Sequence, residues 1–181
     1  MNETIKTLLQ RRTVRTFNDK PVPQEVVGQI LQAGLYAPSA RGEQNAIFVV
    51  IQDQETLKAL SAENARIMGR PDADPFYGAK TVILVVGNNT PNVAYDGSCA
   101  IDNMLNAAWS LGVGTCWIHR ARQEMETEFG KELLKKAGLP EGDYVGVGHI
   151  ALGYFDGEAP EAKPRKDGRV YFIKKAVAAY R

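Results

Sequence analysis

The feature that most constrains the fold is a pair of short apolar runs separated by a helical pattern. Residues 47–51 read Ile-Phe-Val-Val-Ile, and residues 82–86 form a second run of Val, Ile and Leu. Runs of this length, rich in β-branched side chains, indicate strands buried inside a domain. Further strands are predicted at residues 115–118 and 144–154.

Amphipathic helical patterns fill the segments between these strands. The predicted helices are residues 4–12, a segment from Pro23 to near Pro38, and residues 54–66, 92–111 and 122–137. Interleaved helices and strands of this kind predict an α+β or α/β domain in which helices cover a central sheet.

Length and charge restrict the classes of function. A chain of 181 residues suits one domain, residues 1–181, with a sizeable core. The net charge of +1 gives no overall field that would draw the protein to nucleic acid or to an anionic membrane. No apolar run approaches the roughly 18 residues of a membrane span, and the first residues lack a signal-peptide pattern. We therefore expect a cytoplasmic protein.

The few cysteines and histidines give little material for a metal centre. Cys99 and Cys116 form no CxxC pair, so we expect no metal site and interpret both as buried, inert thiols in a reducing compartment. His149 falls inside the last predicted strand and is interpreted as a core histidine. A GxSxG elbow and a P-loop are both missing, so the usual parts for acyl and phosphoryl transfer are not present.

Three arginines and a threonine lie within five residues, where the first predicted helix ends. In an extended segment, residues two apart face the same way, so Arg11, Thr13 and Arg15 would converge on one anion, with Arg12 between them. Guanidinium groups form bidentate bonds with phosphate oxygens. The alternative interpretation is a solvated basic turn at a helix C-terminus.

A second basic cluster lies near the other end of the chain. Lys163, Arg165 and Lys166 surround Pro164, which stiffens the backbone. Taken alone, this cluster is typical of a solvated tail. Taken with the arginines of residues 11–15, it predicts a second clamp on one phosphate.

Two further segments offer polar groups suited to the rim of a heterocycle. Residues 38–44 combine small residues with Ser39 and Gln44, so backbone could approach a planar ligand, although a plain helix-to-strand connection is the alternative. The strand at residues 115–118 ends at His119 and Arg120. His119 is either a structural histidine or the side chain to test for acid–base chemistry. With the basic clusters, these segments predict a site for a phosphorylated heterocycle.

Together the motifs resemble the nitroreductase family of FMN-dependent oxidoreductases. The resemblance rests on residues 11–17, 37–44, 112–118, 151–154 and 163–166. It implies an α+β fold with a mixed central sheet flanked by helices, and a homodimer with two FMN sites at its interface. It also implies a C-terminal extension that docks on the partner subunit, which would explain the apolar residues 170–173.

The resemblance also implies FMN-binding roles for individual residues. The first FMN-binding motif contains Arg11, Arg12, Thr13 and Arg15, and the late phosphate-binding motif contains Lys163, Arg165 and, less closely matched, Lys166. A loop that reaches the flavin from the partner subunit contains Pro38, Ser39, Ala40, Gly42 and Gln44. The segment that approaches the flavin N5 and O4 edge contains Ile118, His119 and Arg120. Gly42 and the pair Asn45-Ala46 depart from the family pattern on the substrate side, where an asparagine and a proline-tryptophan pair are common.

The implied activity is the reduction of small organic acceptors, such as nitroaromatics or quinones, with NADH or NADPH as electron donor in a ping-pong cycle. This chemistry would belong to the cofactor, so no catalytic side chain is assigned. The alternatives are a same-fold FMN enzyme with another substrate (enoate or flavin reduction, reductive dehalogenation) and a non-catalytic flavin-binding protein. The sequence leaves open the physiological acceptor and the choice between NADH and NADPH.

Overall fold

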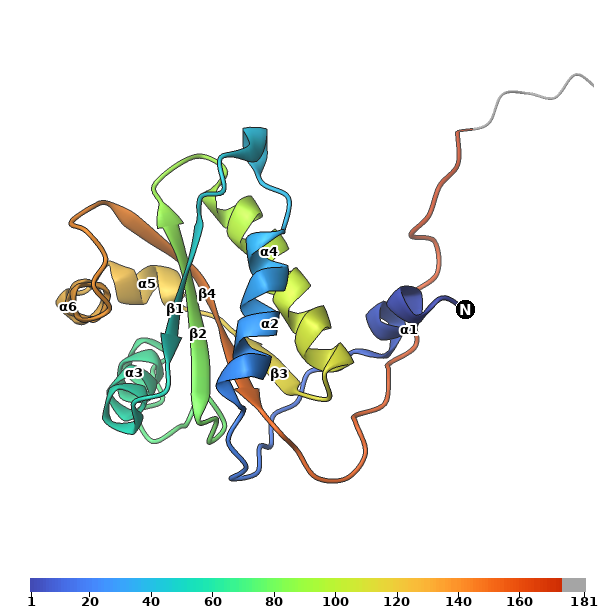
Figure 1. Ribbon diagram of the computed structural model, residues 1–181, viewed down its shortest axis with the longest axis horizontal. Helices are drawn as coiled ribbons and strands as arrows, with labels where there is room; N and C mark the ends of the chain where they lie inside the picture. The colour runs from blue at the N-terminus through green and yellow to red at the C-terminus, as the bar shows by residue number, and fades with distance from the viewer. Residues whose placement is uncertain (174–181) are drawn as a thin grey trace, which may run out of the picture.

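A four-stranded sheet forms the centre of the molecule (Figure 1), of which the computed structural model describes residues 1–173. The strands are β1 (Ala46–Ile51), β2 (Thr81–Asn88), β3 (Gly114–Ile118) and β4 (Tyr144–Gly153), in the order β1-β2-β4-β3. The four predicted strands are confirmed, and all neighbouring strands are antiparallel. A parallel bridge between Thr13 and Thr115, at the outer edge of β3, gives the sheet its mixed character.

Helices cover both faces of the sheet (Figure 1). One face carries α2 (Gln24–Leu35) and α4 (Val93–Ser110), and the other carries α3 (Gln54–Ile67), α5 (Ala121–Met125) and α6 (Glu128–Lys136). Within β2, Ile83 and Val85 belong to the core beneath α2 and α4, whereas Val82, Leu84 and Val86 belong to the opposite core. Burial on both faces explains the unbroken apolar run of this strand, and helices on an antiparallel sheet make the fold α+β rather than α/β.

The predicted helix over residues 122–137 is wrong, because the chain breaks it into α5 and α6. Thr127 caps α6: its hydroxyl accepts a hydrogen bond from the Gly130 N–H and donates one to the Glu124 carbonyl oxygen. A Cβ at Gly130 would collide with the Glu124 carbonyl, so only glycine lets the two helices meet this closely. Hydrophobic periodicity continues across the break and therefore does not reveal it.

Several apolar side chains are exposed where the sequence predicts an inward face. On α1 (Glu3–Gln10), Ile5, Leu8 and Leu9 are about half exposed, and this helix lies to one side of the body (Figure 1). Cys116 is buried as expected, but Cys99 is exposed on α4, so the interpretation of both thiols as buried is wrong. Among residues 1–173, no helix has both the length and the apolar character needed to cross a membrane.

Candidate functional site

The arginine-rich segment docks on the outer edge of β3. The Val14 N–H donates a 2.9 Å hydrogen bond to the Thr115 carbonyl oxygen, and the Asn18 N–H donates one of 2.8 Å to that of Tyr154. Gly114 permits this approach, because a Cβ there would lie 3.0 Å from the side chain of Val14. The helix that the sequence predicts at residues 4–12 therefore ends in an extended segment, as the predicted convergence of the arginines requires.

The three arginines of this segment have different surroundings. Arg11 is the C-cap residue of α1 and is partly buried. Arg12 turns back onto α1, and its Nη1 donates 2.8 Å hydrogen bonds to the carbonyl oxygens of Leu9 and Arg11. Arg15 is exposed and lies beside Cys116: burial raises the pKa of the Cys116 thiol, and the Arg15 guanidinium partly offsets that rise. The contacts of Arg12 with the end of α1 therefore agree in part with the alternative interpretation, a basic turn at a helix C-terminus.

Two polar atoms beside the arginines are buried and unsatisfied. Among the described residues, neither the Arg12 Nε nor the Thr115 Oγ1 has a hydrogen-bond partner. On its outer side, β3 pairs among the described residues only with the segment at Thr13 and Val14. Beyond Thr115, the outward-facing backbone groups of this strand edge are available to a ligand.

The turn that follows β3 carries the next group of predicted site residues. Ile118 is buried, His119 is exposed, and Arg120 adopts a left-handed conformation with φ 79°. The Arg120 Nε donates a 2.8 Å hydrogen bond to the Asn64 Oδ1, and the Asn64 Nδ2 donates one of 3.0 Å to the His119 carbonyl oxygen. The Asn64 side chain of α3 therefore holds both His119 and Arg120 of the turn in place.

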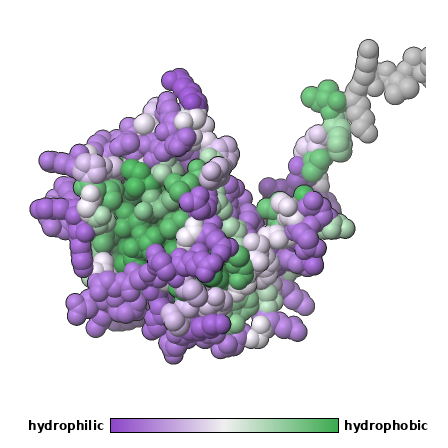
Figure 2. Space-filling model, viewed as in Figure 1, coloured by the Kyte–Doolittle hydropathy of each residue, from purple (hydrophilic) through white to green (hydrophobic). Residues whose placement is uncertain are grey.

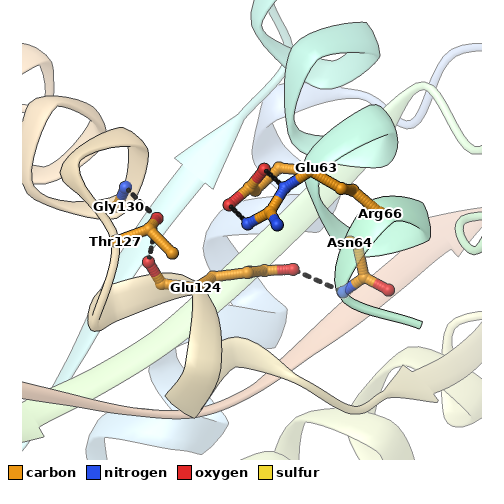
Figure 3. A network of polar contacts seen from close by, with 6 residues as sticks. All are labelled: Glu63, Asn64, Arg66, Glu124, Thr127 and Gly130. Carbon is orange, nitrogen blue, oxygen red and sulfur yellow. Dashed lines mark hydrogen bonds and ion pairs between the residues drawn. The ribbon is translucent and has the colours of Figure 1, made fainter. Parts of the chain in front are cut away.

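A buried polar network extends beneath this turn. Asn64 on α3 and Glu124 on α5 reach toward each other and form a short hydrogen bond (Figure 3). The other carboxylate oxygen of Glu124 lies 2.8 Å from the Nε2 of His149, and all three side chains are fully buried. The prediction that His149 is a core histidine is confirmed. Sequence reasoning missed Asn64 and Glu124, because each lies among charged residues in a predicted amphipathic helix.

The loop of residues 38–44 has a strained and well-anchored backbone. It contains the short 3-10 helix η1 (Ala40–Gly42), and φ is positive at Arg41, Gly42 and Gln44. The Gln44 N–H donates a 3.0 Å hydrogen bond to the Ser39 Oγ, so the Ser39 hydroxyl is used inside the loop. Pro38 is exposed, and Ala40 is partly buried.

Within one chain, this loop and the arginine segment do not meet. The Ala40 N–H binds Asp96 in the first turn of α4, whereas Phe155, which packs beside Val14, stacks on Trp109 in the last turn. Asp96 and Trp109 are separated by roughly 20 Å of helix at about 1.5 Å per residue. Figure 1 shows η1 and α1 near opposite ends of α4.

The late basic cluster lies on the segment that leaves β4. This segment starts beside the arginine region, where the Asn18 side chain donates a 2.9 Å hydrogen bond to Asp156. Lys163, Arg165 and Lys166 follow and are all exposed to solvent. Their role at a phosphate therefore stays a prediction.

Known proteins share both the sequence and the fold. Residues 8–154 match the family model of the nitroreductase family. The chain is 31% identical over 159 residues to a protein of Archaeoglobus fulgidus named NADH dehydrogenase/NAD(P)H nitroreductase, with 85% of this chain and 86% of the relative covered. It is 31% identical over 160 residues to an NAD(P)H FMN reductase of Bacillus subtilis, covering 77% of this chain but only 61% of the relative.

The fold also resembles solved structures. A crystal structure of a nitroreductase with bound FMN from Bacteroides fragilis superposes with a TM-score of 0.87 at 28% identity, over 96% of this chain and 100% of the other. A second FMN-bound nitroreductase, from Desulfitobacterium hafniense, has a TM-score of 0.83 at 25% identity, over 96% and 100% of the two chains.

Proposed function

The chain belongs to the nitroreductase family, and on that basis we propose that it is an FMN-dependent oxidoreductase that transfers electrons from NADH or NADPH to small organic acceptors. The observation that carries the proposal is the cationic, unsatisfied edge of β3. The segment that carries Arg12 and Arg15 docks there, and the Arg12 Nε and the Thr115 Oγ1 are buried with no hydrogen-bond partner among the described residues. Unpaired buried polar groups cost free energy, which supports the presence of a bound group that would complete this edge.

The flavin ring fits the strand edge that continues from this cluster. Beyond Thr13, the outer backbone groups of β3 face no described strand, and the turn at His119 and Arg120 closes the edge. Backbone N–H groups there match the acceptor atoms N5 and O4 of an isoalloxazine. The nearby arginines would favour the negative charge of reduced flavin and so raise its reduction potential.

The chemistry of the site requires little from the side chains. When bound, FMN would take up hydride from NADH or NADPH and deliver it to the acceptor. The donor and the acceptor would occupy the same place in turn, which gives ping-pong kinetics. His119 is exposed at the end of β3 and is the side chain to test for proton delivery.

A second copy of the chain would complete the site. The loop of residues 38–44 and the arginine segment lie near opposite ends of α4, so one chain cannot bring both to one flavin. A two-fold dimer with α4 in its interface would set the loop of one subunit over the arginines of the other. The exposed apolar side chains of α1, together with Tyr36 and Tyr95, support such an interface.

The C-terminal segment offers a further contact with the partner. β1 is an edge strand whose side chains are mostly half buried, and Figure 2 shows an apolar patch on this side of the molecule. Val170, Tyr171 and Ile173 are strongly exposed on the tail. Such residues favour strand addition, so we propose that the tail of each subunit pairs with β1 of the other.

Absorption spectroscopy of the purified protein tests the central proposal. We expect a flavin spectrum whose visible band bleaches anaerobically with NADH or NADPH and returns when a nitroaromatic or quinone is added. Bound flavin that neither nicotinamide reduces would leave only a flavin-binding protein. Protein that neither contains FMN nor quenches the fluorescence of added FMN would contradict the cofactor assignment.

Reduction of free flavin is a second candidate activity, favoured by the relative from Bacillus subtilis that is named an FMN reductase. Parallel turnover assays with added FMN, nitroaromatics, quinones and enones would distinguish the activities. The acceptor with the highest kcat/KM identifies the substrate class.

A further inference from the structure

We propose that Asn64, Glu124 and His149 form a buried tether that holds the turn of residues 118–120 in the shape that receives the flavin ring. The inference rests on the proposed FMN function and adds three positioning residues to it. None of the three belongs to the motifs by which the sequence resembles its family. They come from α3, α5 and β4, which converge beneath the turn.

The turn needs such a tether because its backbone is strained. Arg120 has φ 79° and ψ 0°, a left-handed conformation that is unfavourable for a residue with a Cβ. Strained conformations of this kind persist only where the surrounding structure enforces them, and they concentrate at functional sites. Arg120 directly follows the exposed His119, at the end of the strand edge proposed to carry the flavin.

A single amide group enforces the turn from both sides. The Asn64 Oδ1 accepts from the Arg120 Nε at 2.8 Å, and the Asn64 Nδ2 donates to the His119 carbonyl oxygen at 3.0 Å. The same Nδ2 donates to Glu124. Rotation of the amide would break all three bonds at once, so the orientation of Asn64 fixes the orientation of the turn.

Glu124 and His149 in turn fix Asn64. One oxygen of the Glu124 carboxylate accepts a hydrogen bond from the Asn64 amide. The other carboxylate oxygen lies 2.8 Å from the His149 Nε2. The imidazole packs edge-on against Phe76 at a centroid distance of 5.3 Å. Apolar residues in these positions would pack without the cost of burying a carboxylate, so stability alone does not account for the network.

Comparison of FMN with riboflavin separates this tether from the phosphate cluster. The tether acts on the ring, which both ligands share, whereas the arginines act on the phosphate, which riboflavin lacks. We expect Asn64→Ala and Glu124→Ala to raise the Kd of the apoprotein for FMN and for riboflavin by the same factor, tenfold or more. Arg15→Ala should raise the Kd for FMN by a larger factor than the Kd for riboflavin.

Two further variants separate positioning from general damage to the core. Leu60 lies one turn before Asn64 on α3 and is equally buried. Leu60→Ala should therefore lower the melting temperature without changing the Kd for either flavin. Glu124→Gln keeps an acceptor for Asn64, and the new amide N–H can donate to the His149 Nε2 when the imidazole proton is on Nδ1. We expect its Kd values to stay within about threefold of the parent.

Hydrogen exchange of the apoprotein tests the tether without any flavin. Amides of residues 118–121 should exchange at least tenfold faster in Asn64→Ala than in Leu60→Ala. Unchanged exchange and unchanged Kd values in Asn64→Ala and Glu124→Ala would overturn the inference, as would equal losses in Glu124→Gln and Glu124→Ala. A parent protein that binds neither flavin would instead overturn the proposed function, and the exchange result would still decide whether the tether exists.

Discussion

The backbone N–H of Ala40 donates a 2.9 Å hydrogen bond to the carboxylate of Asp96, which joins the loop after α2 to the first turn of α4. Asp96 is almost fully buried, and its other carboxylate oxygen has no partner among the described residues. The loop that is proposed to cover the flavin of the partner subunit therefore depends on one side chain of the proposed interface helix. This link would connect the geometry of the loop to the proposed dimer.

Removal of this anchor should loosen the loop. We expect Asp96→Ala to lower the free energy of unfolding by about 1–3 kcal/mol, because the Ala40 N–H loses its acceptor. Amides of residues 40–44 should also exchange faster. Denaturant titration with hydrogen exchange measures both effects. Asp19→Ala, which removes a fully exposed carboxylate, is the control and should stay within about 0.5 kcal/mol.

The phosphate assignment predicts non-additive effects on FMN affinity. Arg15→Ala should weaken FMN binding by roughly ten- to a hundredfold, the range expected for one charge-assisted hydrogen bond. Lys163→Ala in the same chain should add less than its effect alone, because both cations act on one phosphate. Fluorescence titration of the apoproteins measures each Kd. Arg122→Ala, at an exposed arginine of α5, is the control; equal affinities in all variants would refute the assignment.

The break between α5 and α6 predicts opposite effects at two glycines. Gly130→Ala should destabilise the fold by about 1–3 kcal/mol, since the new methyl group would collide with the backbone at Glu124. Gly28→Ala on α2 has open space around its Cβ and should stabilise by about 0.5–1 kcal/mol. Urea denaturation measures both changes. Equal effects of the two substitutions would show that the helices do not meet closely at Gly130.

Burial of Cys116 predicts a pH-dependent reactivity. Because burial raises its pKa above the ordinary value of 9.0, the thiol stays protonated at pH 8 and should react slowly with iodoacetamide. In a Cys99→Ser background, folded protein should react at least about tenfold more slowly than protein in urea. The unfolded thiol ionises first, so the stability that Cys116 contributes should be present below pH 9 and decline above it. Equal rates with and without urea would contradict this prediction.

Docking of the tail predicts a change in oligomeric state. Truncation after Arg169 removes the apolar residues 170–173 and all that follow, while the late basic cluster remains. We expect the full chain to be a dimer by light scattering, and the truncated chain to dissociate at a higher protein concentration. Substitution of Val170 and Ile173 by serine should have the same effect at full length. A truncated chain that remains an equally tight dimer would contradict strand addition at β1.

Much of the fold follows from local sequence patterns. The β2 run at residues 82–86 predicts a strand buried on both faces, and the stripe at Ile101, Met104, Leu105 and Ala108 predicts a helix over the core. Both patterns depend only on which side chains avoid water, so they can be recognised without knowing what covers them. The break at Thr127 could not be recognised in this way, because it depends on a close backbone contact of Gly130 with α5.

The same distinction between local pattern and tertiary contact applies to the candidate site. The sequence determined which segments carry cations and small polar residues: residues 11–15, 38–44, 118–120 and 163–166. Only the tertiary structure decided their arrangement, because positions distant in the chain meet through packing: Thr13 beside Thr115, and Asn64 beneath Arg120. Only it separated the loop of residues 38–44 from the arginines, since a rigid helix lies between them. Composition and periodicity indicate which side chains are buried, whereas a binding site depends on the distances between residues that the packing of the elements sets.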